Sequence, residues 1–442
     1  MTEPQTSEPI STKLERIARL ARTAPTLAFR SLAHHIDLAW LKEAYRRTRK
    51  DGALGIDRQS ADEYALNLED NLRHLLDRAK SGGYRAPPVR RVYIPKASGG
   101  QRPLGIPTFE DKVLQRAVAM LLEAIYEQDF LDCSYGFRPR RSAHKLLEAF
   151  QRDAVLMHGG RVLELDIRSF FDSMNHGHLR SVLRRRVRDG VLLRLIDKWL
   201  CAGVLEDGQL VRSDSGTPQG GVISPLLANV FLHDVLDTWF ERDVRPRLRA
   251  TARLYRYADD AVLIFADDGD ARRVADVLSK RFEKYGLTLH PEKTRLVEFW
   301  RPRLSDKGKQ GGTFDLLGFT HYWGRSRLGK WIVKRRTAKD RYSRTLQRVQ
   351  LRCRENRHLP IDAQQRMLSA QLRGHYAYFG ITGNFEALHR LWHEVKAIWR
   401  TWLNRRSQRR SMPWRRMHML LQRYPLPVPR VIRPWLPSAA NP

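Results

Sequence analysis

The chain has 442 residues, with 80 lysines and arginines against 48 aspartates and glutamates, and a formal net charge of +32. Its length predicts two or three packed units instead of one core. A charge of this size exceeds what solubility requires and predicts a polyanionic partner. No stretch is apolar enough over a sufficient length to span a bilayer, and nothing resembles a signal peptide. We therefore expect nucleic acid, not a membrane surface, as the partner.

The cysteine and histidine spacings argue against a structural metal site or a disulfide framework. Cys133, Cys201 and Cys353 stand far apart and form no paired motif, which favours a reducing cytosol. His389 and His393 lie four residues apart in a region of helical pattern and could share a metal. No third ligand with suitable spacing is present, so we interpret them as part of a packed or RNA-facing helix.

The first third of the chain predicts a helical entry region followed by a hairpin. Residues 12–80 place apolar side chains at helical spacing, interrupted by a turn at 50–57. In the segment 84–107, prolines and glycines bracket a short strand that precedes a basic, glycine-containing turn. This pattern predicts a hairpin that carries Lys96 and Arg102.

The middle of the chain predicts strands that end or turn on acidic residues. A helix is expected from Phe109 to Tyr126 and another, after a loop, to about Met157. The strand RVLELD then ends on Asp166, and RLYRYADDAVLIF predicts two apolar strands with Asp259 and Asp260 at the turn. Between them, residues 216–237 read as a glycine-rich loop that opens a helix.

The last part of the chain predicts short strands and then an arginine-rich helical region. After a helix at about 270–286, short strands surround a polar loop, and we expect the sheet to end there, with helices from about Lys334. These helices interleave arginine with tryptophan, which offers phosphate contacts and stacking planes for unpaired bases. Alternatively, the tryptophans form a core and the arginines are solvated. We expect both interpretations to hold in part.

Asp166, Asp259 and Asp260 are the candidate catalytic residues. If their strands lie side by side, the three carboxylates converge at one rim, and their repulsion is tolerable only with cations among them. Oxygen ligands select hard ions, so we expect two Mg²⁺ ions, for which Mn²⁺ is a substitute. Two such ions about 4 Å apart favour nucleotidyl transfer. Taken singly, each acid also has a local explanation, because aspartate favours turns and helix caps.

Eight sequence blocks occur in a fixed order along nearly the whole chain. They are GALGID (52–57), IPKASGGQRPLGIPT (94–108), YGFRPRRSAH (135–144), LELDIRSFFDSM (163–174), GTPQGGVISPLLANVFL (216–232), YADD (257–260), LHPEKT (289–294) and LLGF (316–319). In these blocks the chain resembles the bacterial-type reverse transcriptases and maturases encoded by group II introns. Retroviral enzymes share only the central blocks, whereas YGFRPRRSAH and RPLGIPT are similar specifically to intron-encoded proteins and their relatives.

The resemblance implies an α+β fold of the right-hand polymerase type. Fingers and palm, with an antiparallel palm sheet, would precede an α-helical thumb or maturase domain X. The implied divisions are an N-terminal helical extension and the start of the fingers at 1–80, fingers and palm at 81–335, thumb and domain X at 336–433, and a tail at 434–442.

The resemblance also implies roles for individual residues, matched position by position. Asp166, Asp259 and Asp260 would bind the metals, with the backbone carbonyl of Ile167 as a further candidate ligand. Lys96 and Arg102 would clamp the incoming triphosphate, although a solvated basic turn is the alternative. Phe171 would lie under the sugar and exclude a ribose 2′-hydroxyl, and Gln219 would steady the nucleotide. We expect one of Phe170 and Phe171 to be a core residue. The residues implied in RNA binding are Arg405, Arg406, Arg409 and Arg410.

The function implied by the resemblance is RNA-directed DNA synthesis combined with splicing assistance. The protein would copy an RNA template from a DNA primer with deoxynucleoside triphosphates, bind its intron RNA, and support retrohoming by target-primed cDNA synthesis. We expect it in the bacterial cytosol, associated with the nucleoid during mobility. Because no CxxC pair follows domain X, we do not expect an HNH endonuclease domain.

Two alternatives remain at this point. The first is an RNA-binding splicing factor with a vestigial polymerase lobe, although such a lobe has no use for three mutually repelling acids. The second is a domesticated reverse transcriptase in antiphage defence or beside CRISPR adaptation genes. The YADD box, the full domain X and the absence of a fused partner domain favour a mobile intron.

Overall fold

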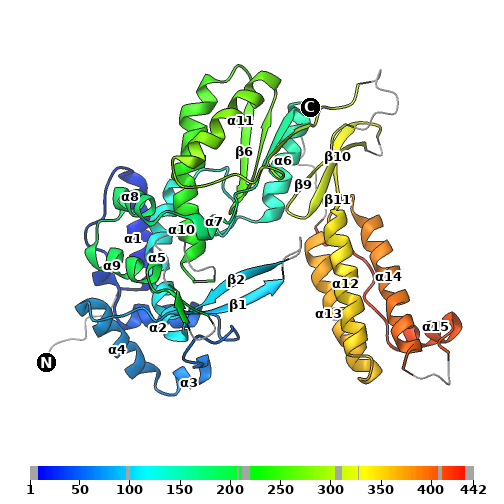
Figure 1. The fold of residues 1–442 in the computed structure, drawn as a ribbon, viewed down its shortest axis with the longest axis horizontal. Helices are drawn as coiled ribbons and strands as arrows, with labels where there is room; N and C mark the ends of the chain where they lie inside the picture. The colour runs from blue at the N-terminus through cyan, green and yellow to red at the C-terminus, as the bar shows by residue number, and fades with distance from the viewer. Residues whose placement is uncertain are drawn as a thin grey trace. The chain divides into compact units, whose positions relative to one another are not determined.

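The computed structural model describes residues 8–95, 100–206, 209–211, 220–303, 311–326, 328–406 and 411–433. The chain forms two compact units, Met1–Val297 and Glu298–Pro442. Helices alternate irregularly with mainly antiparallel sheets, which confirms the α+β class (Figure 1). None of the described helices has the length and apolar character needed to cross a membrane. The three cysteines are free.

The first unit begins with the predicted helical entry region, which comprises α1 (Ile10–Thr23), α2 (Leu38–Arg47), α3 (Ala61–Ala65) and α4 (Leu68–Ser81). Local sequence sets these boundaries. The Asp37 carboxylate caps α2, and Ser60 with Glu63 forms a capping box at the start of α3. Helix α5 (Phe109–Asp129) is buried along most of its length and contacts α1 and α2.

A four-stranded sheet with the strand order β2-β1-β4-β5 follows α4 in sequence. Its strands β1 (Val89–Pro95) and β2 (Gln101–Ile106) form the predicted antiparallel hairpin, and β4 (Val204–Glu206) adds to β1 in parallel. Strand β5 (Gln209–Val211) pairs with β4. The hairpin carries Arg102 on β2.

A second sheet of the first unit has the strand order β6-β7-β3-β8. Its strands are β3 (Arg161–Leu165), β6 (Ala252–Tyr257), β7 (Asp260–Phe265) and β8 (Arg295–Glu298). Helices α6 (Ala143–Leu156) and α11 (Asp268–Glu283) pack against its strands (Figure 1). Helices α7 (Phe170–Ser173), α8 (His176–Arg186), α9 (Gly190–Leu200) and α10 (Ser224–Leu232) belong to the same unit, and α10 continues as a π-helical segment, His233–Val244.

One hydrophobic core runs through the first unit. It includes side chains from α1, α5 and α10 and from the strands β3 and β7. The helical entry region therefore shares its core with the sheet that carries the acidic residues. Burial of this apolar surface is the main force that holds the elements of the site in place.

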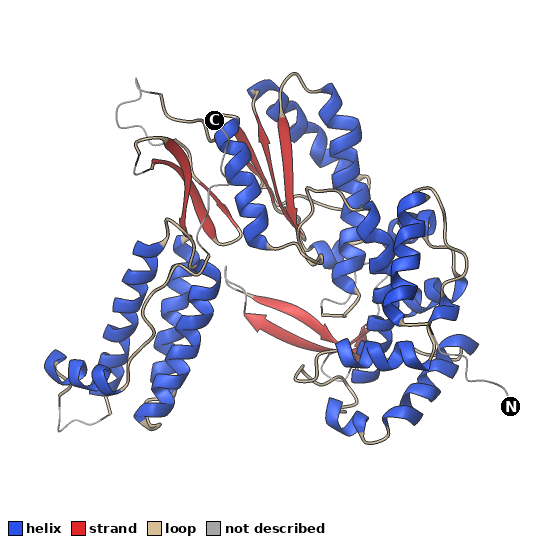
Figure 2. Ribbon diagram, turned by 180° about the vertical axis from the view of Figure 1, so that it is seen from behind, coloured by secondary structure: helices blue, strands red, loops and turns tan. Residues whose placement is uncertain are grey.

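The second unit starts with an antiparallel sheet of the order β11-β10-β9 and continues with four helices (Figure 2). The strands are β9 (Phe314–Leu316), β10 (Phe319–Arg325) and β11 (Trp331–Thr337), and the helices are α12 (Lys339–Glu355), α13 (Ile361–Phe379), α14 (Phe385–Asn404) and α15 (Trp414–Arg423). The helices share a separate core that contains Trp399 and Trp402.

The expectation that helices begin at about Lys334 was wrong. Strand β11 continues to Thr337, and α12 starts at Lys339. Val333, Arg335 and Thr337 are buried on alternate positions of this strand. The basic residues of the segment masked that period-two pattern, because a buried arginine is read from sequence as a polar position.

Candidate active site

The end of β3 and the turn between β6 and β7 meet at one edge of a sheet. Leu165, the last residue of β3, pairs with Ala261 of β7, and Tyr257 of β6 pairs with Asp260. Asp166 directly follows Leu165, so it lies at the same edge as Asp259 and Asp260. The predicted hairpin is confirmed. The two strand segments lie side by side, which was the condition for the three acids to converge.

The turn between β6 and β7, which carries Asp259, has an unusual backbone that a neighbouring loop supports. Ala258 has a φ of +57°, a left-handed conformation that a residue with a Cβ adopts at some cost in energy. A Cβ on Gly136 would collide with the backbone nitrogen of Ala258, so only glycine fits there. The loop of the YGFRPRRSAH block therefore packs directly on the turn.

Arg256, the residue before Tyr257, is fully buried next to this turn and forms several hydrogen bonds. It donates to both carboxylate oxygens of Asp237 at 2.7 and 2.5 Å, and to the carbonyl oxygen of Ala258 at 3.0 Å. Its other bonds go to Asn229 Oδ1 and Ser134 Oγ, each at 2.9 Å. All five N–H donors of the guanidinium are thus used. Arg256 links the turn to the loop before Gly136 and to the helix of the GTPQGG block.

Arg256 and its partners were not predicted from the sequence. A signal was present, because Arg256 is a charged residue within an apolar strand, and such a residue is buried only when it is paired. Its partners lie 19, 27 and 122 residues away in the chain. Sequence spacing could not identify them.

Asp166 forms an ion pair and a backbone hydrogen bond with residues of the LHPEKT block. Lys293 Nζ lies 2.7 Å from Asp166 Oδ2, and the backbone nitrogen of His290 donates to the Asp166 carbonyl at 2.8 Å. Ile167 forms a bridge with Leu289. No role for Lys293 was predicted from the sequence, although this lysine belongs to the LHPEKT block.

The electrostatics of the turn fit a cation-binding site. Burial raises the pKa of the Asp259 carboxyl above its usual range, and the negative charge of Asp166 raises it further. The positive charge of Arg102 opposes this rise, so Arg102 of the β1–β2 hairpin interacts electrostatically with the turn that carries Asp259. A bound cation relieves repulsion of this kind. Within the described ranges, no three acidic, histidine or cysteine side chains are gathered closely enough to hold a metal as they stand.

The predicted nucleotide-binding residues have different surroundings. Arg102 is exposed on β2, whereas Lys96 and Gln219 lie outside the described residues. Phe170 is 2% exposed and belongs to the core, and Phe171 is half-buried against it. The expectation that one of these two rings is a core residue is confirmed.

The last residues of the glycine-rich loop, 220–222, contact β2 and α5 just before α10 begins. A Cβ on Gly220 would lie 2.6 Å from the carbonyl oxygen of Gly105, so Gly220 lies directly against β2. Gln115 of α5 accepts a hydrogen bond from the backbone nitrogen of Val222 at 2.8 Å. These contacts join the loop to the β1–β2 hairpin and to the buried helix α5.

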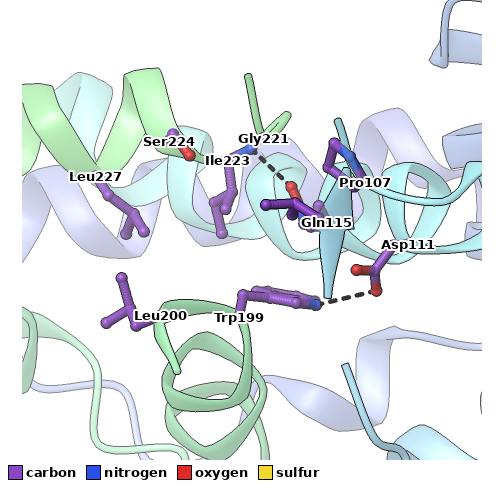
Figure 3. Close-up of a pocket in the computed structure, with 10 residues that line it drawn as sticks. Pro107, Asp111, Gln115, Trp199, Leu200, Gly221, Ile223, Ser224 and Leu227 are labelled. Carbon is purple, nitrogen blue, oxygen red and sulfur yellow. Dashed lines mark hydrogen bonds between the residues drawn. The ribbon is translucent and has the colours of Figure 1, made fainter. Parts of the chain in front are cut away.

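A small cavity of about 20 Å³ is lined by Gly221 and Ile223, just before α10, and by residues of α5 and α9 (Figure 3). Asp111 and Trp199 line it side by side, and Trp199 Nε1 donates to Asp111 Oδ1 at 3.3 Å. Burial raises the pKa of Asp111 to about 7. The cavity has room for about one water molecule, so it is not a substrate pocket.

In the second unit, the predicted RNA-binding arginines are only partly described. Arg405 and Arg406 are exposed at the end of α14, and Arg409 and Arg410 lie outside the described residues. The guanidinium of Arg405 lies 4.9 Å from the ring centre of Trp402. Trp399 and Trp402 are both core residues, so for these two the core interpretation holds. His389 and His393 approach to 3.3 Å between their Nε2 atoms, and no third ligand lies near them in the described part of the chain.

Comparison with known proteins places this geometry in a family. Residues 94–321 match the family described as reverse transcriptase (RNA-dependent DNA polymerase). The chain is 36% identical to Protein YkfC of Escherichia coli (strain K12) over 287 residues, which cover 58% of this chain and 75% of YkfC.

Two further relatives have names that refer to introns. The group II intron-encoded protein LtrA of Lactococcus lactis subsp. cremoris is 43% identical over 183 residues, which cover 41% of this chain and 30% of LtrA. The mitochondrial nuclear intron maturase 2 of Arabidopsis thaliana is 28% identical over 235 residues, 44% of this chain and 30% of that maturase. This chain thus spans less than a third of both proteins. It belongs to the reverse transcriptase (RNA-dependent DNA polymerase) family, among the relatives of group II intron-encoded proteins and intron maturases.

Proposed function

We propose that the chain is an active RNA-directed DNA polymerase whose catalytic residues are Asp166, Asp259 and Asp260. The observation that carries this proposal is the register of β3 and β7, which puts the end of one strand and the turn of a hairpin at a single edge. Mg²⁺ ions held by the three carboxylates, with the Ile167 carbonyl as a further ligand, would activate the primer 3′-hydroxyl and stabilise the leaving pyrophosphate. Mn²⁺ would substitute for Mg²⁺.

The protein's own residues have separate tasks in this proposal. Arg102 and Lys96 bind the triphosphate of the incoming nucleotide, since a guanidinium suits bidentate contact with phosphate. Phe171 contacts the sugar and selects deoxynucleotides, and its half-buried position against the core supports this role because the ring is held in place. Gln219 steadies the nucleotide.

We further propose that the protein binds its intron RNA, assists splicing and supports retrohoming by target-primed cDNA synthesis in the bacterial cytosol, in association with the nucleoid. The similarity to LtrA and to the intron maturase supports this part. The RNA-binding residues would be Arg405, Arg406, Arg409 and Arg410. The functional divisions proposed are 1–80, 81–335 for fingers and palm, 336–433 for thumb and domain X, and 434–442.

The test replaces Asp259 or Asp260 by asparagine. Each variant should lose extension of a DNA primer on an RNA template by at least a hundredfold, because a neutral amide binds a hard cation weakly, while RNA binding stays near the wild-type level. Asp276→Asn on the exposed face of α11 is the matched control and should extend normally. Near wild-type extension by both site variants would contradict the assignment and favour a splicing factor with a vestigial polymerase lobe.

A further inference from the structure

Phe137, in the loop of the YGFRPRRSAH block, combines a strained backbone with an exposed ring. Its φ is +55°, and the residue is 60% exposed. A bulky residue at positive φ is uncommon, because its side chain clashes with its own backbone. Burial of the ring would offset that cost, but the ring is largely in solvent. The fold therefore gains little from this side chain, and strain of this kind is typical of functional sites.

The residues on both sides of Phe137 are anchored. The carbonyl oxygen of Gly136 accepts a hydrogen bond from Asn229 Nδ2 at 2.7 Å, and the backbone of Gly136 packs on Ala258. On the other side, the buried Arg138 donates to the carbonyl oxygens of Leu131 and Ser134 at 2.8 and 2.9 Å. Hydrogen bonds thus fix the backbone on both sides of Phe137.

The exposed ring lies beside the catalytic turn. Its centre is 6.3 Å from that of Tyr257, the residue that pairs with Asp260. Arg140, three residues further along, is also exposed and also has a positive φ, of +60°. The loop that supports the turn therefore exposes the flat apolar ring of Phe137 and the cation of Arg140. Both residues are held in unfavourable backbone conformations.

We propose that Phe137 packs against the primer–template duplex at its growing end, and that Arg140 contacts a backbone phosphate of the same duplex. This inference rests on the proposed polymerase function, since the primer 3′-hydroxyl must reach Asp259 and Asp260, and the last base pair then lies next to the turn. An A-form-like duplex has a wide and shallow minor groove that is recognised mostly by shape. A ring in this groove contacts sugars and base edges without reading sequence.

The first experiment measures binding of an RNA–DNA primer–template in the Asp259→Asn background, so that it does not depend on catalysis. Phe137→Ala should weaken binding of the duplex roughly tenfold, on the order expected when the apolar contact area of one aromatic ring is lost. Leu156→Ala is the matched control, because this leucine at the end of α6 is also exposed, at 71%, and should leave affinity unchanged. Equal affinities of the Phe137→Ala and Leu156→Ala variants would overturn the proposal.

A second variant separates binding from folding. Phe137→Gly removes the ring and relieves the positive φ, so its melting temperature should equal or exceed that of the wild type while its duplex affinity falls as in Phe137→Ala. A photoreactive benzoylphenylalanine at position 137 should crosslink to the two or three nucleotides nearest the primer terminus. Crosslinks only to distant regions of intron RNA, or only to another protein, would assign this ring to a different partner and refute the proposal.

Failure of this proposal and failure of the proposed function give different results. If primer extension survives in the Asp259→Asn and Asp260→Asn variants, the catalytic assignment fails whatever the behaviour of Phe137. If extension is abolished in them but duplex binding does not depend on Phe137, only the duplex contact is wrong.

Discussion

At the scale of the residue, Arg256 is a buried charge that pairs with Asp237 and also bonds to the turn that carries Asp259. Its guanidinium is 0% exposed and so is the carboxylate of Asp237. Breaking such a pair costs about 3–5 kcal/mol, because the remaining charge is left uncompensated. The same guanidinium donates to the carbonyl oxygen of the strained Ala258, so the ion pair is connected directly to the turn that carries Asp259.

We therefore expect Arg256→Lys to reduce the primer-extension rate more than tenfold and to raise the Mg²⁺ concentration needed for half-maximal extension. A lysine ammonium cannot replace five donors in a planar fork. Ser134→Ala removes one of the five bonds without touching Ala258, and should cost about 1 kcal/mol of stability with little effect on Mg²⁺ dependence. Both variants are compared at a temperature where melting curves show them folded. A wild-type Mg²⁺ dependence in Arg256→Lys would argue that the network serves stability alone.

At the scale of the element, the junction of α5 and α9 contains a carboxyl that resists ionisation. Asp111 lies in the first turn of α5 and bonds to Trp199 of α9. Burial raises its pKa to about 7, and the hydrogen bond from Trp199 lowers it in part. The usual value for an unfolded aspartate is about 3.9. Between these two values the folded protein binds more protons than the unfolded chain.

Because the folded protein binds more protons, its stability should decrease as pH rises. As pH rises from about 4 to about 7, the free energy of unfolding should fall by up to about 1.4 kcal/mol per pH unit from this group, and the decrease should level off above pH 7. Asp111→Asn should remove that part of the slope. Thermal melting between pH 5 and 8 measures it, with Asp276→Asn as an exposed control. If the slopes of wild type and Asp111→Asn coincide, Asp111 is ionised throughout this range.

At the scale of the whole molecule, the net charge of +32 favours binding to a polyanion. Replacing Arg405, Arg406, Arg409 and Arg410 together by glutamine should weaken intron RNA binding and depress assisted splicing, while extension of a simple primer–template is largely kept. The slope of log affinity against log salt should fall by roughly 0.7 to 0.9 for each phosphate that the variant no longer neutralises.

Replacement of the same four residues by lysine is the matched control, because lysine keeps the charge and should keep the salt slope. Affinity for intron RNA across a salt series, measured beside the primer-extension rate, separates the two activities. An unchanged salt slope in the glutamine variant, together with abolished extension, would make this segment part of the polymerase's template-binding surface.

Short-range patterns in the sequence were sufficient for much of the site. The apolar runs around Asp259 and Asp260 predicted a hairpin because strands of that length and composition need only local turn chemistry. The strand before Asp166 followed from the same reasoning. Strand β11 was missed because Arg335 is buried, and a residue's burial depends on partners that its own sequence neighbourhood does not contain.

What the sequence by itself determined was the identity of the chemical groups: three carboxylates on strand ends, a basic hairpin, an arginine-rich helical region and an excess of positive charge. Only the tertiary structure decided that Gly136 lies against Ala258, that Lys293 pairs with Asp166 and that Arg256 joins Asp237 to Ser134. These pairs are brought together by the burial of a shared core, which is non-directional and acts on the chain as a whole. Contacts between segments far apart in the chain arise from that packing, so no local pattern records them.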